Sequence, residues 1–421
     1  NKIHEREMDK TDIPGTFNAG ATLGPVNETN MARIWNKHKQ SNTPLKRKVF
    51  VAMSGGVDSS VAALLLKQAG YRLRGVYMKE WVPPGIACEA GSDRVMATRV
   101  AAHLEIPFEV WDFRKEYKKQ VADYMLKEYR AGRTPNPDVM CNKHIKFGMF
   151  LQRALKKGAD YIATGHYARV ASIADTRRSY AEKRRQFILR TATDKNKDQS
   201  YFLWTLGQEQ LQYCLFPVGE YTKQEVRAIA KKAKLPSWDK KDSQGVCFVG
   251  KLDFADFLRK FLPHKKGKIM DVAGREIGTH DGVWFYTIGQ KIGIMNYESG
   301  IKGFKNRIYV AAKDIKKNIL VVAEEMAPEL YKKELLASNM HWISGAAPKL
   351  PLKCKARIRY RQPVQQCIVA PWTHADHTQK NAEKITICRV LFAKPQRAIT
   401  PGQSIVFYKG NIMLGGGIID K

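Results

Sequence analysis

The chain has 421 residues, enough for two or three domains, and its formal net charge of +32 favours a polyanionic partner such as nucleic acid. Apolar residues make up 44% of the sequence, and no apolar run reaches the ~18 residues of a membrane-spanning helix. The seven cysteines are scattered, without any Cys-x-x-Cys pair. This pattern argues against a disulfide framework or a zinc ribbon and favours a reducing compartment.

Residues 1–47 are polar and mixed in charge, and we expect them to form a flexible extension. Acidic residues such as Glu5 and Asp9 are unlike a mitochondrial transit peptide, and no apolar core of a secretion signal is found there. We therefore expect a cytoplasmic protein, with the mitochondrial matrix as the alternative, and no association with a membrane.

A candidate anion site follows the first strand of the chain. Val49–Met53 predicts a short buried strand, Ser54–Ser60 reads Ser-Gly-Gly-Val-Asp-Ser-Ser, and Val61–Leu66 predicts a helix. Gly55 and Gly56 allow a close backbone approach, and the amides of a helix N-terminus attract phosphate. The sequence therefore predicts a phosphate-binding loop, with an ordinary strand–helix turn as the alternative.

The side chains of this loop refine the prediction. The hydroxyls of Ser54, Ser59 and Ser60 are further donors, and an acidic Asp58 inside a phosphate loop indicates a Mg²⁺ contact. The loop lacks the Gly-Lys-Ser/Thr ending of a Walker A motif. It resembles the loop of the ATP pyrophosphatases, which cleave ATP to AMP and pyrophosphate.

Strands and helices alternate after the loop. The expected strands are Leu73–Met78, Phe108–Asp112 and Tyr161–Gly165, and the expected helices are Arg94–Leu104, Glu116–Tyr129 and Phe147–Lys157. This alternation predicts an α/β fold with a doubly wound parallel sheet, whose ligands bind at the carboxyl ends of the strands. The phosphate loop and the pair Gly165–His166 both lie at such ends.

The rest of the chain changes in character. Tyr167–Val170 and Phe187–Arg190 are expected to pair as a hairpin around an exposed basic insertion at 171–186, and 208–235 is expected to be helical, with a capping box at Thr222–Glu225. From about residue 305 to 421 we expect a small antiparallel barrel with a long polar loop at Trp372–Lys384. Its expected strands include Arg307–Ala311, Ile319–Val322, Cys354–Arg359, Cys367–Val369, Lys384–Phe392 and Ser404–Tyr408.

Two cysteines lie in polar surroundings. Asp138 and Cys141 follow a segment that contains Pro135 and Pro137. If the turn after Pro137 is helical, the two side chains share a face, and the carboxyl can exchange a proton during thiol chemistry. Lys143 and Lys146 favour the thiolate of Cys141. Cys247 lies between glycines, close after Lys240 and Lys241 in sequence. A buried structural cysteine is the alternative at both positions, and the sequence does not show whether the two meet.

Several stretches have the composition of an RNA-binding surface. His166 and Arg169 are candidates for phosphate or RNA contacts, and Lys197–Ser200 is expected to be an exposed loop before an apolar core segment. Arg357–Arg361 mixes basic and aromatic side chains, as nucleic-acid surfaces do, with a solvated strand face as the alternative.

Eight motifs taken together resemble the tRNA-specific 2-thiouridylase family, whose members place sulfur on C2 of the wobble uridine. They occur in order over residues 48–421 and read SGGVDSS, TPNPDVMCNKHIKF, ATGHYAR, KDQSYFLW, DSQGVCFVG, YTIGQK, RYRQ and PGQSIVFY with LGGGII. Lys291 stands where arginine is common in the family, and the 171–186 and 372–384 segments are longer and more polar than expected. These departures affect tRNA contacts more than chemistry.

The resemblance implies a division into an N-terminal extension (1–47), a catalytic domain (48–215), a central domain (216–300) and a tRNA-binding β-barrel (301–421). It implies that ATP contacts the residues of the loop and two further positions, namely Ala52, Met53, Ser54, Gly55, Gly56, Val57, Asp58, Ser59, Met78 and Gly165. It implies tRNA contacts from Asn136, Pro137, Asp138, His166, Lys197, Asp198, Gln199, Arg359, Tyr360 and Gln403.

The resemblance also implies the chemistry. Cys247 matches the persulfide-carrying cysteine, Cys141 the partner that ends in a disulfide with it, and Asp138 an acid/base. The implied cofactors are ATP and Mg²⁺, without a separate protein metal site. The implied partners are tRNA of the Lys, Glu and Gln acceptors and a persulfide donor, either a sulfur carrier or a cysteine desulfurase, and the enzyme is expected to be a monomer. An adenylating ligase with the same loop and a non-catalytic RNA-binding protein are the rival interpretations.

Overall fold

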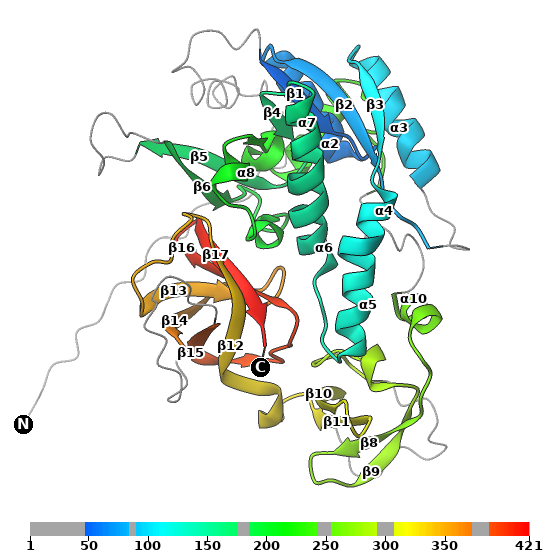
Figure 1. Ribbon diagram of the computed structural model, residues 1–421, viewed down its shortest axis with the longest axis vertical. Coiled ribbons are helices and arrows are strands. Elements are labelled where there is room, and N and C mark those ends of the chain that lie inside the picture. The colour runs from blue at the N-terminus through cyan, green and yellow to red at the C-terminus, as the bar shows by residue number, and fades with distance from the viewer. Residues whose placement is uncertain are drawn as a thin grey trace, which may run out of the picture.

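The computed structural model describes residues 47–83, 90–174, 185–241, 254–292, 307–372 and 387–420. Several expectations therefore lie outside the described residues: the N-terminal extension, most of the 171–186 insertion, Cys247, and the loop after Trp372. Figure 1 shows three parts, with a parallel sheet at the top, a barrel at the lower left and a smaller sheet at the lower right. None of the described helices is long and apolar enough to cross a membrane.

The first part is built on a five-stranded parallel sheet, as the sequence predicts. Its strand order is β3-β2-β1-β4-β7, and all four pairings are parallel. The strands are β1 (Lys48–Ala52), β2 (Arg72–Lys79), β3 (Phe108–Asp112), β4 (Tyr161–Ala163) and β7 (Cys214–Leu215). The carboxyl ends of β1, β2 and β4 therefore meet at one edge, where the phosphate loop begins.

Both faces of this sheet are buried, which explains the unbroken apolar run of β1. Val49 and Val51 belong to the cluster on one face, whereas Phe50 and Ala52 belong to the cluster on the other. The first face is covered by α2 (Val57–Gln68), α3 (Ala90–His103) and α9 (Lys223–Lys232). Thr222 and Glu225 form the predicted capping box at the start of α9.

The opposite face packs against two long helical columns. One consists of α4 (Arg114–Tyr117), the π-helical segment η2 (Lys118–Ala122) and α5 (Asp123–Arg130), and the other of α6 (Pro137–Met140), the π-helical segment η3 (Cys141–Phe150) and α7 (Leu151–Lys156). The second column starts ten residues before the predicted helix. The reason is local: Asn136 occupies the N-cap and its side chain accepts from the Val139 amide, while Pro137 occupies the first helical turn.

The predicted helix over 208–235 is wrong in its middle. The structure has α8 (Gln208–Leu211), strand β7, the 3₁₀ segment η6 (Pro217–Glu220) and then α9. Pro217 breaks the helical pattern, and a Cβ on Gly219 would lie 1.8 Å from the carbonyl oxygen of Ala168. The chain is therefore pulled close to the neighbouring hairpin at this point.

That hairpin, β5 (Ala168–Ala174) and β6 (Arg185–Thr191), forms as predicted, with Val170 opposite Leu189. It extends the C-terminal sheet, because β6 pairs with the start of β17 (Ile412–Ile419). The hairpin that follows the parallel sheet and the barrel thus share a continuous sheet, which Figure 1 shows above β16 and β17.

The small sheet has the order β10-β11-β8-β9. Its strands are β8 (Gly267–Asp271), β9 (Glu276–His280), β10 (Ile308–Asp314) and β11 (Ile319–Glu324), with α10 (Phe254–Phe261) and the 3₁₀ segment η7 (Val283–Phe285) beside them. β10 and β11 were expected in the barrel, but β11 pairs in parallel with β8. The central sheet therefore extends to Glu324 rather than ending at residue 300. The expected boundary at residue 215 also shifts. Because α9 packs in the core of the first domain, that first domain extends beyond residue 215.

The third part is a closed six-stranded antiparallel barrel, which confirms the predicted fold class. Its order is β12-β15-β14-β13-β16-β17, and a β12–β17 pairing closes it. The 3₁₀ segment η8 (Pro328–Leu330) leads into it, and its strands are β12 (Tyr331–Trp342), β13 (Leu352–Arg357), β14 (Gln365–Pro371), β15 (Ile387–Arg397), β16 (Ser404–Lys409) and β17. The core contains Val369, Val390 and Phe407.

Candidate functional site

The phosphate loop adopts the geometry of an anion site. Gly55 has φ +77°, and a Cβ there would lie 2.3 Å from the carbonyl oxygen of Asp93, so only glycine fits. Gly56 is the N-cap of α2 and brings no capping side chain to the first helical turn. The dipole and first amides of α2 are therefore available to a phosphate group.

The three loop serines differ in exposure. Ser54 is exposed, and its hydroxyl lies 3.2 Å from that of Ser59. Ser60 is fully buried and bonds to the Gly56 carbonyl and to Ser237, at 2.8 and 2.9 Å. The expectation that Ser60 donates to phosphate is therefore wrong: its hydroxyl closes the loop from inside.

Asp58 is held by two donors from other parts of the chain. Its Oδ1 accepts from the Tyr167 hydroxyl at 2.8 Å and from Nζ of Lys223 at 2.7 Å. Lys223 is the first residue of α9. The carboxylate in the loop is therefore already neutralised by a lysine, which the sequence analysis did not identify.

Gly165 and His166 follow β4, which ends two residues earlier than predicted. A Cβ on Gly165 would lie 2.7 Å from the Ser59 amide nitrogen, so glycine lets this segment press against the loop itself. His166 is buried between Phe147 and Phe216, its Nδ1 lies 2.8 Å from the Thr164 hydroxyl, and burial lowers its pKa well below the ordinary value. These surroundings favour packing over an exposed RNA contact.

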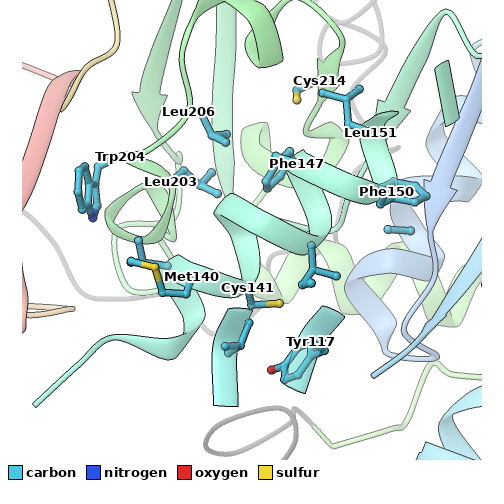
Figure 2. Packing of buried hydrophobic residues seen from close by; sticks show 14 of the residues in the cluster. Tyr117, Met140, Cys141, Phe147, Phe150, Leu151, Leu203, Trp204, Leu206 and Cys214 are labelled. Carbon is cyan, nitrogen blue, oxygen red and sulfur yellow. The ribbon is translucent and has the colours of Figure 1, made fainter. Parts of the chain in front are cut away.

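Asp138 and Cys141 lie on one continuous helical column, which fulfils the condition for a shared face. Cys141 begins the π-helical segment and is 2% exposed. Figure 2 shows its thiol inside the core, with Tyr117 close by and Phe147 further along the same column. π-Helical geometry is frequent at functional sites. Cys247 lies in the 242–253 segment outside the described residues.

Acidic and basic groups gather around Asp138. Burial raises the pKa of Asp138, and the charge of Lys146 opposes that shift. Burial also raises the pKa of Glu80, which interacts with Lys146, Asp138 and Asp93. Glu80 directly follows β2, so the rule that ligands meet strand carboxyl ends could have identified it. Glu80 therefore interacts electrostatically both with Asp138 and with Asp93, whose carbonyl lies beside Gly55 of the phosphate loop.

A pocket of about 250 Å³ opens beside this turn, between the catalytic domain and the barrel. Asn136, Pro137 and Asp138 line it from one side, and Tyr360 and Gln403 line it from the other. Its aromatic wall is the pair Phe202 and Tyr360, whose ring centroids are 4.6 Å apart. Aromatic side chains with a few polar groups suit a nucleobase.

Gln403 and Arg359 fix this pocket in place. Nε2 of Gln403 donates to the carbonyl oxygens of Thr134 and Pro135 at 2.9 and 3.0 Å. Nη2 of Arg359 donates to the carbonyl oxygens of Ala398 and Ile288 at 2.8 and 3.2 Å. Both side chains therefore connect separate parts of the chain, in addition to any contact with RNA.

The segment Lys197–Ser200 is not the exposed loop that the sequence predicts. Asp198 is 2% exposed, accepts from the amides of Ala192 and Ser200, and forms an ion pair with Arg357 at 2.9 Å. Ser200 is fully buried, whereas Lys197 and Gln199 are half-buried, and Gln199 accepts from the Tyr167 amide at 2.9 Å. Through Asp198, the segment connects the end of the β5–β6 hairpin to Arg357 of β13.

These features together define a nucleotide-binding α/β domain fused to two small β domains, with a base-sized pocket at the joint. Family models match all three parts: a tRNA methyl transferase HUP domain over residues 47–251, a tRNA methyl transferase PRC-barrel domain over 255–324, and an aminomethyltransferase beta-barrel domain over 332–419.

Curated relatives match over nearly their whole length. The tRNA-specific 2-thiouridylase MnmA of Francisella philomiragia is 46% identical over 379 residues, covering 88% of this chain and 99% of that protein. The protein of the same name from Halalkalibacterium halodurans is 45% identical over 384 residues, covering 90% and 96%. The chain belongs to the tRNA-specific 2-thiouridylase family.

Among solved structures, the chain is similar to the U34-tRNA thiolase NcsA of Methanococcus maripaludis, with 17% identity and a TM-score of 0.34 over 55% of this chain and 70% of that one. It is also similar to a 4-thiouridine synthetase in complex with RNA and ATP, with 18% identity and a TM-score of 0.34 over 49% and 46%.

Proposed function

We propose that this protein is a tRNA-uridine 2-sulfurtransferase that makes 2-thiouridine at wobble position 34. The observation that carries the proposal is the pocket between Asn136–Asp138 and Tyr360, because Asp138 lines this base-sized space and lies on the same helical column as Cys141. Membership of the 2-thiouridylase family supports the same reaction.

The phosphate loop would activate the base. The C2 oxygen of uridine is a poor leaving group, and its attack on the α-phosphate of ATP forms an O-adenylated uridine, in which AMP is the leaving group, while pyrophosphate departs. The amides around Gly55 and Gly56 would stabilise the charge on the phosphates. The nucleotide site would also include Ala52, Met53 and Val57 beside the loop. Met78, near the end of β2, would face the adenosine.

The loop residues are compatible with Mg²⁺ that binds together with the phosphates of the nucleotide. Mg²⁺ is commonly held by one or two carboxylates together with substrate phosphates. The described residues contain no cluster of three or more His, Cys, Asp or Glu side chains that would form a protein cage. Asp58 is the carboxylate that the loop offers, and Mg²⁺ would supply charge neutralisation for pyrophosphate.

Sulfur would arrive through the two cysteines. The Cys141 thiolate attacks the inner sulfur of a persulfide on Cys247, which forms the Cys141–Cys247 disulfide and releases hydrosulfide. Hydrosulfide then attacks C2, the C2–O bond breaks, and AMP leaves. Asp138 would accept the proton lost from the incoming sulfur, and its raised pKa suits proton exchange.

The tRNA would lie across the joint of the domains. Asn136, Pro137 and Asp138 would contact the extruded uridine, with Tyr360 and Gln403 on the facing wall. Lys197, Gln199 and Arg359 would contact tRNA nearby, whereas Asp198 and His166 would act by supporting the fold, since both are buried. We further propose a cytoplasmic monomer that acts on the Lys, Glu and Gln acceptors and receives sulfur from a cysteine desulfurase or a sulfur carrier.

The test is labelled sulfur transfer to unmodified tRNA in the presence of ATP. The proposal predicts label in the uridine at position 34 and one AMP for each sulfur incorporated. AMP formation without label would instead favour an adenylating ligase. Tight tRNA binding without either product would favour a non-catalytic RNA-binding protein.

A further inference from the structure

The phosphate loop carries an acid where a Walker A loop carries a base. From Ser54 to Ser60 the sequence contains Asp58 but no lysine or arginine, whereas a Walker A loop ends with a lysine that reaches the phosphates. A carboxylate in the first turn of α2 would repel a triphosphate. Apart from the Mg²⁺ that accompanies ATP, positive charge at this loop has to come from elsewhere in the chain.

Lys223 meets that requirement from a position 165 residues later. Its Nζ lies 2.7 Å from Oδ1 of Asp58 and 6.0 Å from the centroid of the Tyr167 ring. The Lys223 side chain is 12% exposed, and that of Asp58 is 33% exposed. The lysine is therefore nearly enclosed, while the carboxylate it neutralises still reaches the surface of the loop.

The surrounding structure holds Lys223 in this position before any ligand arrives. The Lys223 amide donates to Oδ2 of Asp194 at 3.0 Å, and the Thr222–Glu225 capping box fixes the start of α9. Val226 and Ala230 anchor the helix in the core cluster that contains α2. A lysine tied down in this way loses little freedom on ligand binding, as preorganised electrostatic groups do.

We propose that Lys223 is a positioning residue for the nucleotide: by neutralising Asp58 it makes the loop able to accept the phosphates of ATP. The inference rests on the proposed use of ATP. The simpler interpretation is an ion pair that only attaches α9 to α2. The two differ in what Lys223→Ala does, because only the first expects nucleotide affinity to fall independently of stability.

The experiment is equilibrium binding of a non-hydrolysable ATP analogue with Mg²⁺ to the full chain by calorimetry. Lys223→Ala should weaken binding at least tenfold, Lys223→Arg should retain most of the affinity, and Lys232→Ala should bind as wild type. Lys232 is the matched control, since it is exposed on the same helix. Two measurements show whether each variant is folded. One is thermal unfolding in the absence of nucleotide, and the other is tRNA binding.

A double variant tests the electrostatic reason. If Lys223 acts by neutralising Asp58, Lys223→Ala combined with Asp58→Asn should bind the analogue more tightly than Lys223→Ala alone when Mg²⁺ is removed with EDTA. Mg²⁺ is left out of this comparison because Asp58 is also its proposed contact. A double variant that binds no better overturns the neutralisation. Folded Lys223→Ala protein with wild-type affinity overturns the positioning role and leaves the ion pair structural. Wild-type protein that binds no analogue would overturn the proposed ATP chemistry as well.

Discussion

Trp204 of the catalytic domain lies directly against Gly416 of the barrel. A Cβ on Gly416 would lie 2.8 Å from Cγ of the indole and 2.6 Å from the carbonyl oxygen of Ile405. The indole Nε1 also donates to the Ser404 hydroxyl at 3.0 Å, and the Tyr201 hydroxyl donates to the Ser404 carbonyl at 2.8 Å. Gly416 of β17 is therefore the point on the barrel against which the indole of Trp204 packs, next to the base-sized pocket.

This contact predicts that Gly416→Ala destabilises the protein by about 1–3 kcal/mol, because neither the indole nor the Ile405 backbone has room to move. Chemical denaturation measures the effect. The control is Gly91→Ala on α3, where an added Cβ meets nothing within 4 Å and should be neutral or stabilise by about 0.4–1 kcal/mol. Equal stability of the two variants would show that the docking surface repacks freely.

Asp198 should be a structural residue rather than an RNA contact. Replacing it by alanine leaves Arg357 and two amides without their acceptor, and removing one partner of a buried pair costs about 3–5 kcal/mol. Urea unfolding should show this loss, with a smaller one for Asp198→Asn. Glu334→Ala removes an ion pair with Arg389 that is exposed on the barrel surface and should change stability little. An Asp198→Ala protein of normal stability but weak tRNA binding would contradict this assignment.

The Trp204–Gly416 contact and the Asp198–Arg357 ion pair both join residues far apart in the sequence, and such features are harder to predict from sequence than local ones. The phosphate loop and the parallel sheet depend on neighbouring residues, so local patterns indicate them. The burial of Asp198 depends on Arg357, far along the chain, and was not predictable from a polar segment. β17 falls in the segment expected to be strand-like but is not one of the strands named from the sequence. Its three glycines disfavour strands, although close packing requires them here. The sequence does not indicate Lys223, because α9 has the pattern of an ordinary amphipathic helix.

Asp138 should make stability depend on pH. Burial raises its pKa in the folded protein, with Lys146 opposing the shift, so the folded state binds this proton more tightly than the unfolded state. Its contribution to stability is therefore present below the ordinary carboxyl pKa of about 4 and is lost as pH rises through the folded pKa.

Asp138→Asn should accordingly be more stable than wild type at pH 7 to 8, with the difference shrinking toward pH 4 in a series of thermal melts. Asp239→Asn changes an exposed carboxylate after α9 and serves as the control. The same Asp138 variant should lose thiolation. A pH-independent difference between Asp138→Asn and wild type would contradict the role assigned to burial.

The charge of +32 predicts strongly salt-dependent tRNA binding. Each phosphate neutralised by lysine or arginine releases counterions, so a protein with six to ten such contacts loses roughly 10³–10⁵ in affinity between 50 and 200 mM salt. Filter binding at increasing salt measures the slope. A flat response would remove electrostatics as the basis of RNA binding.

The most direct test of the central claim is mass spectrometry of nucleosides from tRNA incubated with ATP, a cysteine desulfurase and cysteine. Wild-type protein and Cys354→Ser, which changes a barrel thiol away from the site, should both produce 2-thiouridine. Cys141→Ser and Cys247→Ser should each produce none while tRNA binding is retained. Full 2-thiouridine formation by either variant would contradict sulfur transfer through these two cysteines.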